Sequence, residues 1–407
     1  MSFNQTERQN ASTFSQELRL NSTEGGTASM EGRLFWTAGL FYFQLDGDMS
    51  SFETNFFPDT QVFDAPPGTV LSQTHTMDIE GRNWAAYGQA TYNLTEQLHL
   101  TAGIRYDYEE KTVVQNASGD ELFSDNYVDF RNSASFEKVT PKLTLDYQII
   151  EDLMIYATYS QGFLSGGFNF APESTENANA FGPEQATNYE IGLKSVLWDG
   201  RMQFNLTGFH VDYTDLQVAV INENTQLQET RNAAKAISQG VETNVVAQIT
   251  DDLEIDAAFA YTDAHYTRFC DGVTQESSML KGAACLDAGG EDLEGELLEG
   301  YAKSNVRAGF RYRLPIAAWG DWSLRSDWSY QSSTSFPGYT QPSYSTVDAG
   351  IDFTSMSERY QVGLWGRNLT DEIFVTGCSG FGNTDNGANC TISDPRTYGI
   401  SLKAKFR

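Results

Sequence analysis

The sequence of 407 residues predicts an all-β fold, and specifically a transmembrane antiparallel β-barrel. Three observations lead to this interpretation. Apolar and polar residues alternate with period two, short turns alternate with long polar connections, and no apolar run approaches the roughly 18 residues of a membrane-spanning helix. The third observation excludes a membrane protein built from helices.

Composition narrows the class of partner and the number of domains. The chain carries 55 Asp and Glu against 26 Lys and Arg, a formal net charge of −29. Nucleic-acid-binding surfaces need basic patches and none is visible, so we exclude nucleic acid as a partner. Length alone would suggest two or three domains of about 150 residues. Composition shifts and Pro/Gly-rich linkers are missing, however, so we interpret residues 1–407 as a single barrel domain.

The clearest pair of expected strands lies between residues 82 and 110. From Trp84 to Leu94, apolar or small residues occupy the even positions. Only residues 95–97 separate this run from a second alternating run. In the second run we expect one set of side chains to face outward and the other to face the lumen: Leu100, Ala102, Ile104 and Tyr106 against His99, Thr101 and Arg105.

The same pattern continues to the end of the chain. Further hairpins are expected at Glu151–Asp152, at Asp199–Gly200 and at 250–252, and Asp-Gly is a dipeptide that suits a tight turn. Five more alternating runs follow, at 305–314, 322–330, 347–353, 360–369 and 397–406. Their polar faces carry charged residues, which a packed soluble core would not accept without pairing.

Connection lengths favour an outer-membrane type of barrel. Turns of about two to six residues alternate with long polar segments, which we place at 46–80, 112–135, 163–183, 266–300 and 376–394. Strands of about ten residues with short turns at one rim and long loops at the other are typical of such barrels. Aromatic residues near strand ends would form interfacial girdles: Trp36, Tyr106, Tyr108, Trp198, Trp319 and Trp322. The alternative is a secreted β-sandwich or propeller, which predicts shorter strands and more even loops.

The four cysteines form two short-range couples in polar, glycine-containing segments. We expect two disulfides in external loops, Cys270 with Cys285 and Cys378 with Cys390, because closing short loops costs the least chain entropy. The four histidines are scattered, so no metal site is expected. The start, MSFNQTERQN, has no apolar signal segment, and either it was removed or the chain is incomplete.

No catalytic constellation emerges, and we expect neither an enzyme nor a cofactor. The segment GFLSGG (162–167) lacks the spacing of a nucleophile elbow and is interpreted as a strand end entering a loop. The acidic run 289–300 could chelate calcium, but a solvated loop rim is favoured because the EF-hand spacing is not met.

Two sets of residues are candidates for ligand contact. Loop aromatics could stack on a flat ligand, with loop packing as the alternative: Phe168, Phe170, Phe181, Phe336 and Tyr339, and with less support Phe56, Phe57 and Phe63. Lumen arginines could attract an anion, with counter-charging of lumen acids such as Asp107, Asp327, Asp348 and Asp352 as the favoured alternative: Arg105, Arg307, Arg311, Arg313, Arg325 and Arg367.

Several segments together resemble the C-terminal barrel of TonB-dependent receptors. These are 139–170, 183–218, SQGVETNV (238–245), WGRNLTDEIF (365–374) and PRTYGISLKAKF (395–406), and the likeness extends from about Phe14 to Phe406. The resemblance implies a receptor in the outer membrane of a Gram-negative bacterium, in contact with lipid. It further implies TonB-energised uptake of a scarce ligand, with a ferric siderophore as the first candidate. The alternative is a plugless passive pore or adhesin.

The chain departs from the family pattern in its extent. We count about fifteen strands, corresponding to the C-terminal part of a 22-stranded barrel, whereas the plug that contacts TonB and about seven strands are not in the sequence. We therefore expect residues 1–407 alone not to perform energised transport. Leu164 stands where the family usually has a basic residue, and Arg407 follows the terminal aromatic Phe406. The ligand cannot be read from the sequence, since vitamin B12, haem, glycans and nickel chelates use similar barrels.

Overall fold

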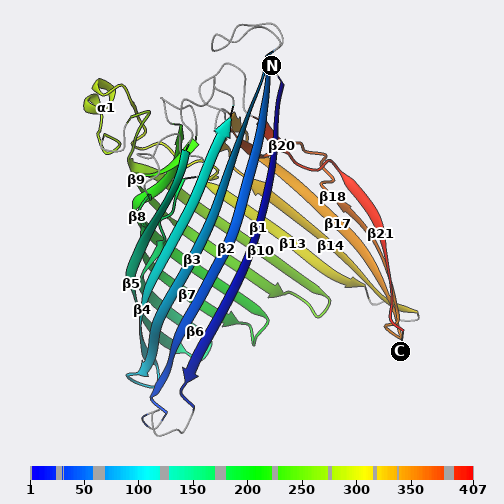
Figure 1. The fold of residues 1–407 in the computed structure, drawn as a ribbon. Coiled ribbons are helices and arrows are strands. Elements are labelled where there is room, and N and C mark those ends of the chain that lie inside the picture. The colour runs from blue at the N-terminus through cyan, green and yellow to red at the C-terminus, as the bar shows by residue number, and fades with distance from the viewer. Residues whose placement is uncertain are drawn as a thin grey trace.

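Fifteen strands form one antiparallel sheet in which every strand lies beside its neighbours in the chain, from β1 to β21 (Figure 1). The computed structural model describes residues 2–23, 30, 32–57, 69–119, 128–169, 180–221, 228–273, 277–314, 319–336, 339–379 and 389–406. The sheet confirms the prediction of an all-β antiparallel fold with about fifteen strands. No helix among the described residues is both long and apolar enough to span a membrane.

The strands of the main sheet are longest in the first third of the chain. They are β1 (Ser2–Asn21), β2 (Leu34–Phe57), β3 (Thr69–Asn93), β4 (Leu98–Gly119), β5 (Val128–Ile150), β6 (Leu153–Leu164), β7 (Glu184–Leu197), β8 (Met202–Ile221), β9 (Gln228–Gln248), β10 (Leu253–Arg268), β13 (Ser304–Leu314), β14 (Gly320–Gln331), β17 (Tyr344–Ser355), β18 (Tyr360–Arg367) and β21 (Thr397–Ala404). Small hairpins and one short helix lie in the connections: β11 (Cys270–Asp271) with β12 (Glu291–Asp292), β15 (Thr334–Phe336) with β16 (Tyr339–Gln341), β19 (Val375–Ser379) with β20 (Asn389–Ile392), and α1 (Ala283–Asp287).

Short and long connections alternate along the chain, as predicted. The short turns expected at 95–97, 151–152, 199–200 and 250–252 all join neighbouring strands. In the turn between β7 and β8, Trp198, Asp199 and Gly200 have φ of 56°, 52° and 86°. Glycine takes this left-handed conformation without a steric penalty, which explains the Asp-Gly signal.

Two segments predicted as long loops are mostly strand, so those predictions were wrong. In the predicted loop 46–80, β2 continues to Phe57 and β3 begins at Thr69. In the predicted loop 112–135, β4 continues to Gly119 and β5 begins at Val128. β3 has 25 residues whereas β6 has 12, so the expected length of about ten residues holds for the shorter strands only. The misreading has a physical cause, because backbone pairing continues with polar side chains on both faces, as where Asp46 lies opposite Glu80. Residues 58–68 and 120–127 lie outside the described residues.

The two faces of the sheet differ in chemistry. Apolar side chains opposite one another share one face, which we call the outer face: Leu18 with Leu40 on β1 and β2, and Leu364 with Ile400 on β18 and β21. All four are more than half exposed. Exposed apolar area of this extent marks a surface for lipid or another partner. Arginines, carboxylates and amides gather on the opposite face, the inner face.

Aromatic residues border the outer face. Tyr42, Trp84 and Tyr108 lie in one row, with ring centroids 5.6 Å and 6.0 Å apart. At the short-turn end, Trp198 and Trp319 are 61% and 83% exposed. The two groups bracket the apolar band, which is the arrangement expected of interfacial girdles.

Candidate functional site

Charged side chains on the inner face pair with one another, in one case within a strand, Arg105 with Asp107 on β4, and otherwise across neighbouring strands. The arginine–carboxylate contacts are Arg105 to Asp107 (2.7 Å), Arg307 to Asp327 (2.9 Å), Arg311 to Glu254 (3.3 Å) and Arg325 to Asp352 (3.5 Å). The carboxylate of Asp348 instead accepts the backbone N–H of Asn368 at 2.8 Å. These contacts support the counter-charging interpretation. Arg313 has no ion pair within the described ranges, and the guanidinium of Arg367 lies 5.3 Å from the ring centroid of Trp365.

A hollow of about 490 Å³ opens on the inner face of β8, β9, β10, β13 and β14. Most of its lining comes from two adjacent cross-strand rows. One row is Asn205, Asn244, Ala258, Arg307 and Ser329, and the other is Thr207, Glu242, Ala260, Asn305, Gln331 and Tyr344. The methyl groups of Ala258 and Ala260 on β10 lie between longer side chains on β9 and β13. We call this feature the alanine hollow.

A folded segment, which we call the inner shelf, crosses the inner face of the sheet at the end that carries the long connections. It consists of residues 165–169 and 180–183, whose two parts pair through Gly167 and Phe181. Side chains from the flanking strands hold its main chain. Lys111 and Gln115 on β4 donate to the carbonyls of Gly166 and Asn169 (2.7 Å each), and Gln217 on β8 and Asn232 on β9 donate to that of Gly182 (3.0 and 2.9 Å). The shelf therefore links β4 to β8 and β9 above the short strands β6 and β7.

Gly166 is required by the close packing of this shelf. A Cβ atom at Gly166 would lie 2.2 Å from the carbonyl oxygen of Phe181 and 2.5 Å from the ring of Phe136. Neither contact is tolerable, and the first involves backbone. Gly166 thus serves the turn from β6 into the shelf, in agreement with the interpretation of GFLSGG as a strand end entering a loop.

The predicted ligand-contact aromatics fall into two groups. Phe168 and Phe181 both belong to the inner shelf, where Phe168 is only 8% exposed and packs with Met77 and Val113. Phe336 and Tyr339 lie opposite one another in the β15–β16 hairpin, with Tyr339 39% exposed. The burial of Phe168 favours loop packing for that residue. Phe170 and Phe63 lie outside the described residues, and the side chains of Phe56 and Phe57 are also not described.

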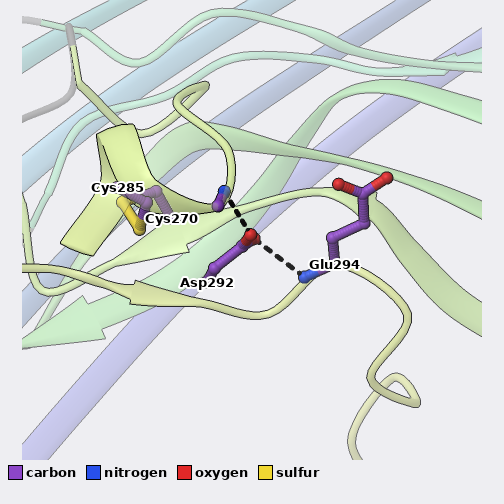
Figure 2. Close-up of a disulfide and its surroundings, with 5 residues drawn as sticks. Cys270, Cys285, Asp292 and Glu294 are labelled. Carbon is purple, nitrogen blue, oxygen red and sulfur yellow. Dashed lines mark hydrogen bonds between the residues drawn. A yellow bond between two sulfur atoms is a disulfide. The ribbon is translucent and has the colours of Figure 1, made fainter.

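Both expected cysteine pairs are present in the structure, in the long connections. Cys270 and Cys285 are bonded across 15 residues with their Cα atoms 5.7 Å apart, and Cys378 and Cys390 lie opposite one another on β19 and β20. The first pair closes a small lobe around α1, shown in Figure 2.

The acidic run in this lobe contributes to its internal structure. The carboxylate of Asp292 accepts the backbone N–H groups of Gly282 and Glu294, the latter at 3.1 Å (Figure 2). Within the described residues, no three His, Cys, Asp or Glu side chains are arranged to hold a metal ion.

The lobe is anchored to the extended ends of β8 and β9 by an apolar cluster. Phe269 is 5% exposed and packs with Val218 and Ala233, and Tyr266 lies against the same cluster. On the outer face of β10, the apolar residues end at Tyr261, and the charged residues Asp263 and His265 follow. Tyr266 comes after them and therefore lies beyond the apolar band. Burial raises the pKa of the Tyr266 hydroxyl to about 12, and the carboxylates of Glu299 and Asp271 act in the same direction. The phenol therefore stays neutral at physiological pH.

Sequence reasoning missed the alanine hollow and the side chains that hold the shelf. Ala258 and Ala260 are visible in the alternation of LEIDAAFAY, but the residues beside them depend on the register of three separate strands. Lys111 precedes its partner Gly166 by 55 residues, and no local pattern connects the two. The only available signal was two small residues at successive inner positions of one strand.

The chain matches the family model described as TonB dependent receptor-like, beta-barrel, over residues 2–369. It is 25% identical over 334 residues to the metal-pseudopaline receptor CntO of Pseudomonas aeruginosa strain UCBPP-PA14, covering 80% of this chain and 42% of the relative. It is 24% identical over 357 residues to the ferrioxamine B receptor of Salmonella typhimurium strain SL1344, covering 85% and 45%. The chain thus spans less than half the length of these relatives.

Solved structures show the same fold. The chain superposes on the ferric yersiniabactin uptake receptor FyuA from Yersinia pestis with a TM-score of 0.79 and 19% identity, covering all of this chain and 56% of that one. The ferric citrate transporter FecA gives a TM-score of 0.65 with 15% identity, covering 99% and 56%. These relatives and neighbours are transport receptors and not enzymes.

Proposed function

Because the chain belongs to the family of TonB-dependent receptor-like β-barrels, we propose that it forms wall and loops of an outer-membrane receptor for a scarce metal chelate. A ferric siderophore is the first candidate ligand. The protein is a receptor and not an enzyme. In this proposal TonB supplies the energy for uptake, the outer face contacts lipid, and the inner face and long connections contact the ligand on its way through.

The opposite chemistry of the two faces is the observation that carries this proposal. Ile104 and Ile191, on the outer face, are 59% and 66% exposed, an arrangement that water disfavours and lipid favours. On the inner face, the guanidinium of Arg307 and the carboxylate of Asp327 are paired and still open to solvent. A wall that is apolar outside and charged inside suits a water-filled passage across a membrane.

The printed names of the relatives support a metal chelate as ligand. They include receptors for metal-pseudopaline, ferrioxamine B and ferric pyoverdine. The names differ in the ligand, so they support the class of ligand and leave its identity open. The disulfide-bonded lobe and the hairpins give the loop end the ordered surfaces that capture requires.

Growth on defined iron sources tests the proposal. The gene is deleted in its source bacterium, and growth is compared with ferrioxamine B, ferric pyoverdine, ferric yersiniabactin or haem as sole iron source. We expect the deletion to abolish growth on at least one chelate while growth on the others remains. Unchanged growth on every source would contradict the proposal. Uptake that needs the gene but persists without TonB would favour the passive pore.

A further inference from the structure

We propose that the inner shelf is a brace that ties two separate parts of the wall together, so that the loop end of the protein holds one shape. The first part, which we call the first arm, consists of residues 69–80 on β3, 111–119 on β4 and 128–141 on β5. The second part, the second arm, consists of residues 216–221 on β8 and 228–234 on β9, with the disulfide-bonded lobe that packs on them. This inference goes beyond the proposed function, because it holds for any ligand.

The ladder of backbone hydrogen bonds is interrupted between the two arms. Pairing between β5 and β6 stops at Lys142 and Ser160, so residues 128–141 pair with β4 alone among the described strands. Pairing between β7 and β8 stops at Thr214, so residues 216–221 pair with β9 alone in the same part of the chain. Strand pairing therefore does not fix the distance between the arms. Without another contact, each arm would be free to swing about the point where its outer pairing ends.

The first arm holds the shelf through a buried amide and an apolar cluster. Gln115 on β4 is 2% exposed, and its amide donates to the carbonyl oxygen of Asn169 at 2.7 Å. Phe168, the preceding shelf residue, packs with Met77 on β3 and Val113 on β4. Water competes poorly for a hydrogen bond at a buried site, so this contact is stronger than an exposed one.

The second arm holds the shelf through main-chain groups. The side chain of Asn169 accepts the N–H of Thr230 on β9 at 2.7 Å and donates to its carbonyl oxygen at 3.1 Å. The side chain of Asn232 does the same for Gly182 of the shelf, accepting its N–H and donating to its carbonyl oxygen at 2.9 Å. Gln217 on β8 donates to that carbonyl oxygen at 3.0 Å. The shelf is thus bonded to both strands of the second arm.

Asn169 joins the two arms within one residue. Its main-chain carbonyl is held by Gln115 of the first arm, and its side chain holds Thr230 of the second. An asparagine amide presents an acceptor and donors in one plane, which matches the N–H and C=O of a single main-chain residue.

The brace has a consequence for ligand capture. The disulfide-bonded lobe packs on the second arm through Phe269, so the brace also sets how far the lobe stands from the first arm. Surfaces that are already ordered lose less conformational entropy when a ligand binds. A braced loop end therefore meets its ligand with both arms in place.

The test measures the distance between the arms in the protein purified from outer membranes. Ser135 on β5 and Ala219 on β8 are exposed, so each is replaced by cysteine and spin-labelled, and pulsed electron double resonance gives the distance distribution. We expect one narrow distribution when the shelf is intact. Asn169→Ala and Asn232→Ala should each broaden it, because each removes a side chain that joins the shelf to the second arm.

Two further measurements report on the Asn169 contact itself. Asn169→Asp keeps the acceptor for the N–H of Thr230 and loses the donor to its carbonyl oxygen, so the distribution should have an intermediate width. In Asn169→Ala the amide of Thr230 loses its acceptor, and its hydrogen should exchange with solvent about tenfold faster.

Matched controls separate the brace from general damage. Asn368→Ala removes another asparagine whose amide donates to two carbonyl oxygens, in the connection between β18 and β19, and it should leave the distance distribution narrow. Lys138→Met removes a side-chain hydrogen bond to Gln185 that spans the break in the ladder without involving the shelf, and it should also leave the distribution narrow.

The outcomes decide the proposal without a ligand. A broad distribution when the shelf is intact overturns the brace, as does a distribution that stays narrow in both Asn169→Ala and Asn232→Ala. Broadening by Lys138→Met or Asn368→Ala as large as that by Asn169→Ala also overturns it, because the restraint would then lie outside the shelf. None of these results bears on the receptor function, which the growth experiment tests separately.

Discussion

A single arginine on the outer face should destabilise the protein far more than one on the inner face. Ile104 is 59% exposed on β4, opposite Gly88 on β3 and Pro141 on β5. Ile104→Arg places a guanidinium in the apolar band without a carboxylate beside it. The inner-face comparison is Thr101→Arg on the same strand, three residues away.

The position of Ile104 in the band sets the expected magnitude. A strand that rises about 3.4 Å per residue and tilts about 40° advances about 2.6 Å per residue along the membrane normal. From Leu98 to Tyr108 this amounts to about 26 Å, close to the ~25 Å height of such bands. Ile104 then lies about 10 Å below the Tyr108 level and about 16 Å above Leu98. Near the midplane an arginine costs about 2–4 kcal/mol.

The inner-face substitution should be much milder. Thr101 shares a hydrogen bond of 2.7 Å with Thr91, and losing it costs about 1 kcal/mol. Denaturant titration of both variants in lipid vesicles, followed by tryptophan fluorescence, measures the difference in unfolding free energy. We expect Ile104→Arg to be the less stable by about 2 kcal/mol. Equal destabilisation by the two substitutions would refute the assignment of the faces.

Three further outcomes follow from the loop end of the molecule. Non-reducing peptide mapping of exported protein should recover two disulfides, Cys270 with Cys285 and Cys378 with Cys390, and a crossed pairing or four free thiols would contradict this. Gly166→Ala should loosen the inner shelf and speed its proteolysis, at a cost of about 1–3 kcal/mol, whereas Gly162→Ala, with open space around its Cβ position, should not. Asn368→Ala should cost about 1–3 kcal/mol in a denaturant titration, because its amide donates to the carbonyls of Glu372 and Asp394 from a buried site; an unchanged midpoint would show those bonds to be dispensable.

Local patterns in the sequence were sufficient to predict the faces of the sheet and its turns. Alternation places Ile104 outward and Arg105 inward because successive residues of a strand point to opposite faces, and the structure agrees. The turn at Asp199–Gly200 was recognisable because glycine is the residue that best tolerates φ of 86°. The cysteine couples were near enough in the chain for loop entropy to select among the pairings.

Features that depend on register or on distant contacts could not be predicted. The length of β2 and β3 was underestimated because polar residues such as Asp46 and Glu80 were read as loop, although backbone pairing does not require an apolar face. The alanine hollow depends on which residues of β9 and β13 lie opposite Ala258 and Ala260, and only strand register determines this. The buried position of Phe168 depends on Met77 and Val113, which are far away in the sequence.

Uptake of radiolabelled iron tests the central claim most directly. Cells of the source bacterium with and without this gene, and with and without TonB, are supplied with the chelate on which the deletion strain fails to grow. The account predicts that accumulation inside the cell requires both the gene and TonB, and that surface binding requires the gene alone. Equal accumulation in cells that lack TonB would contradict it.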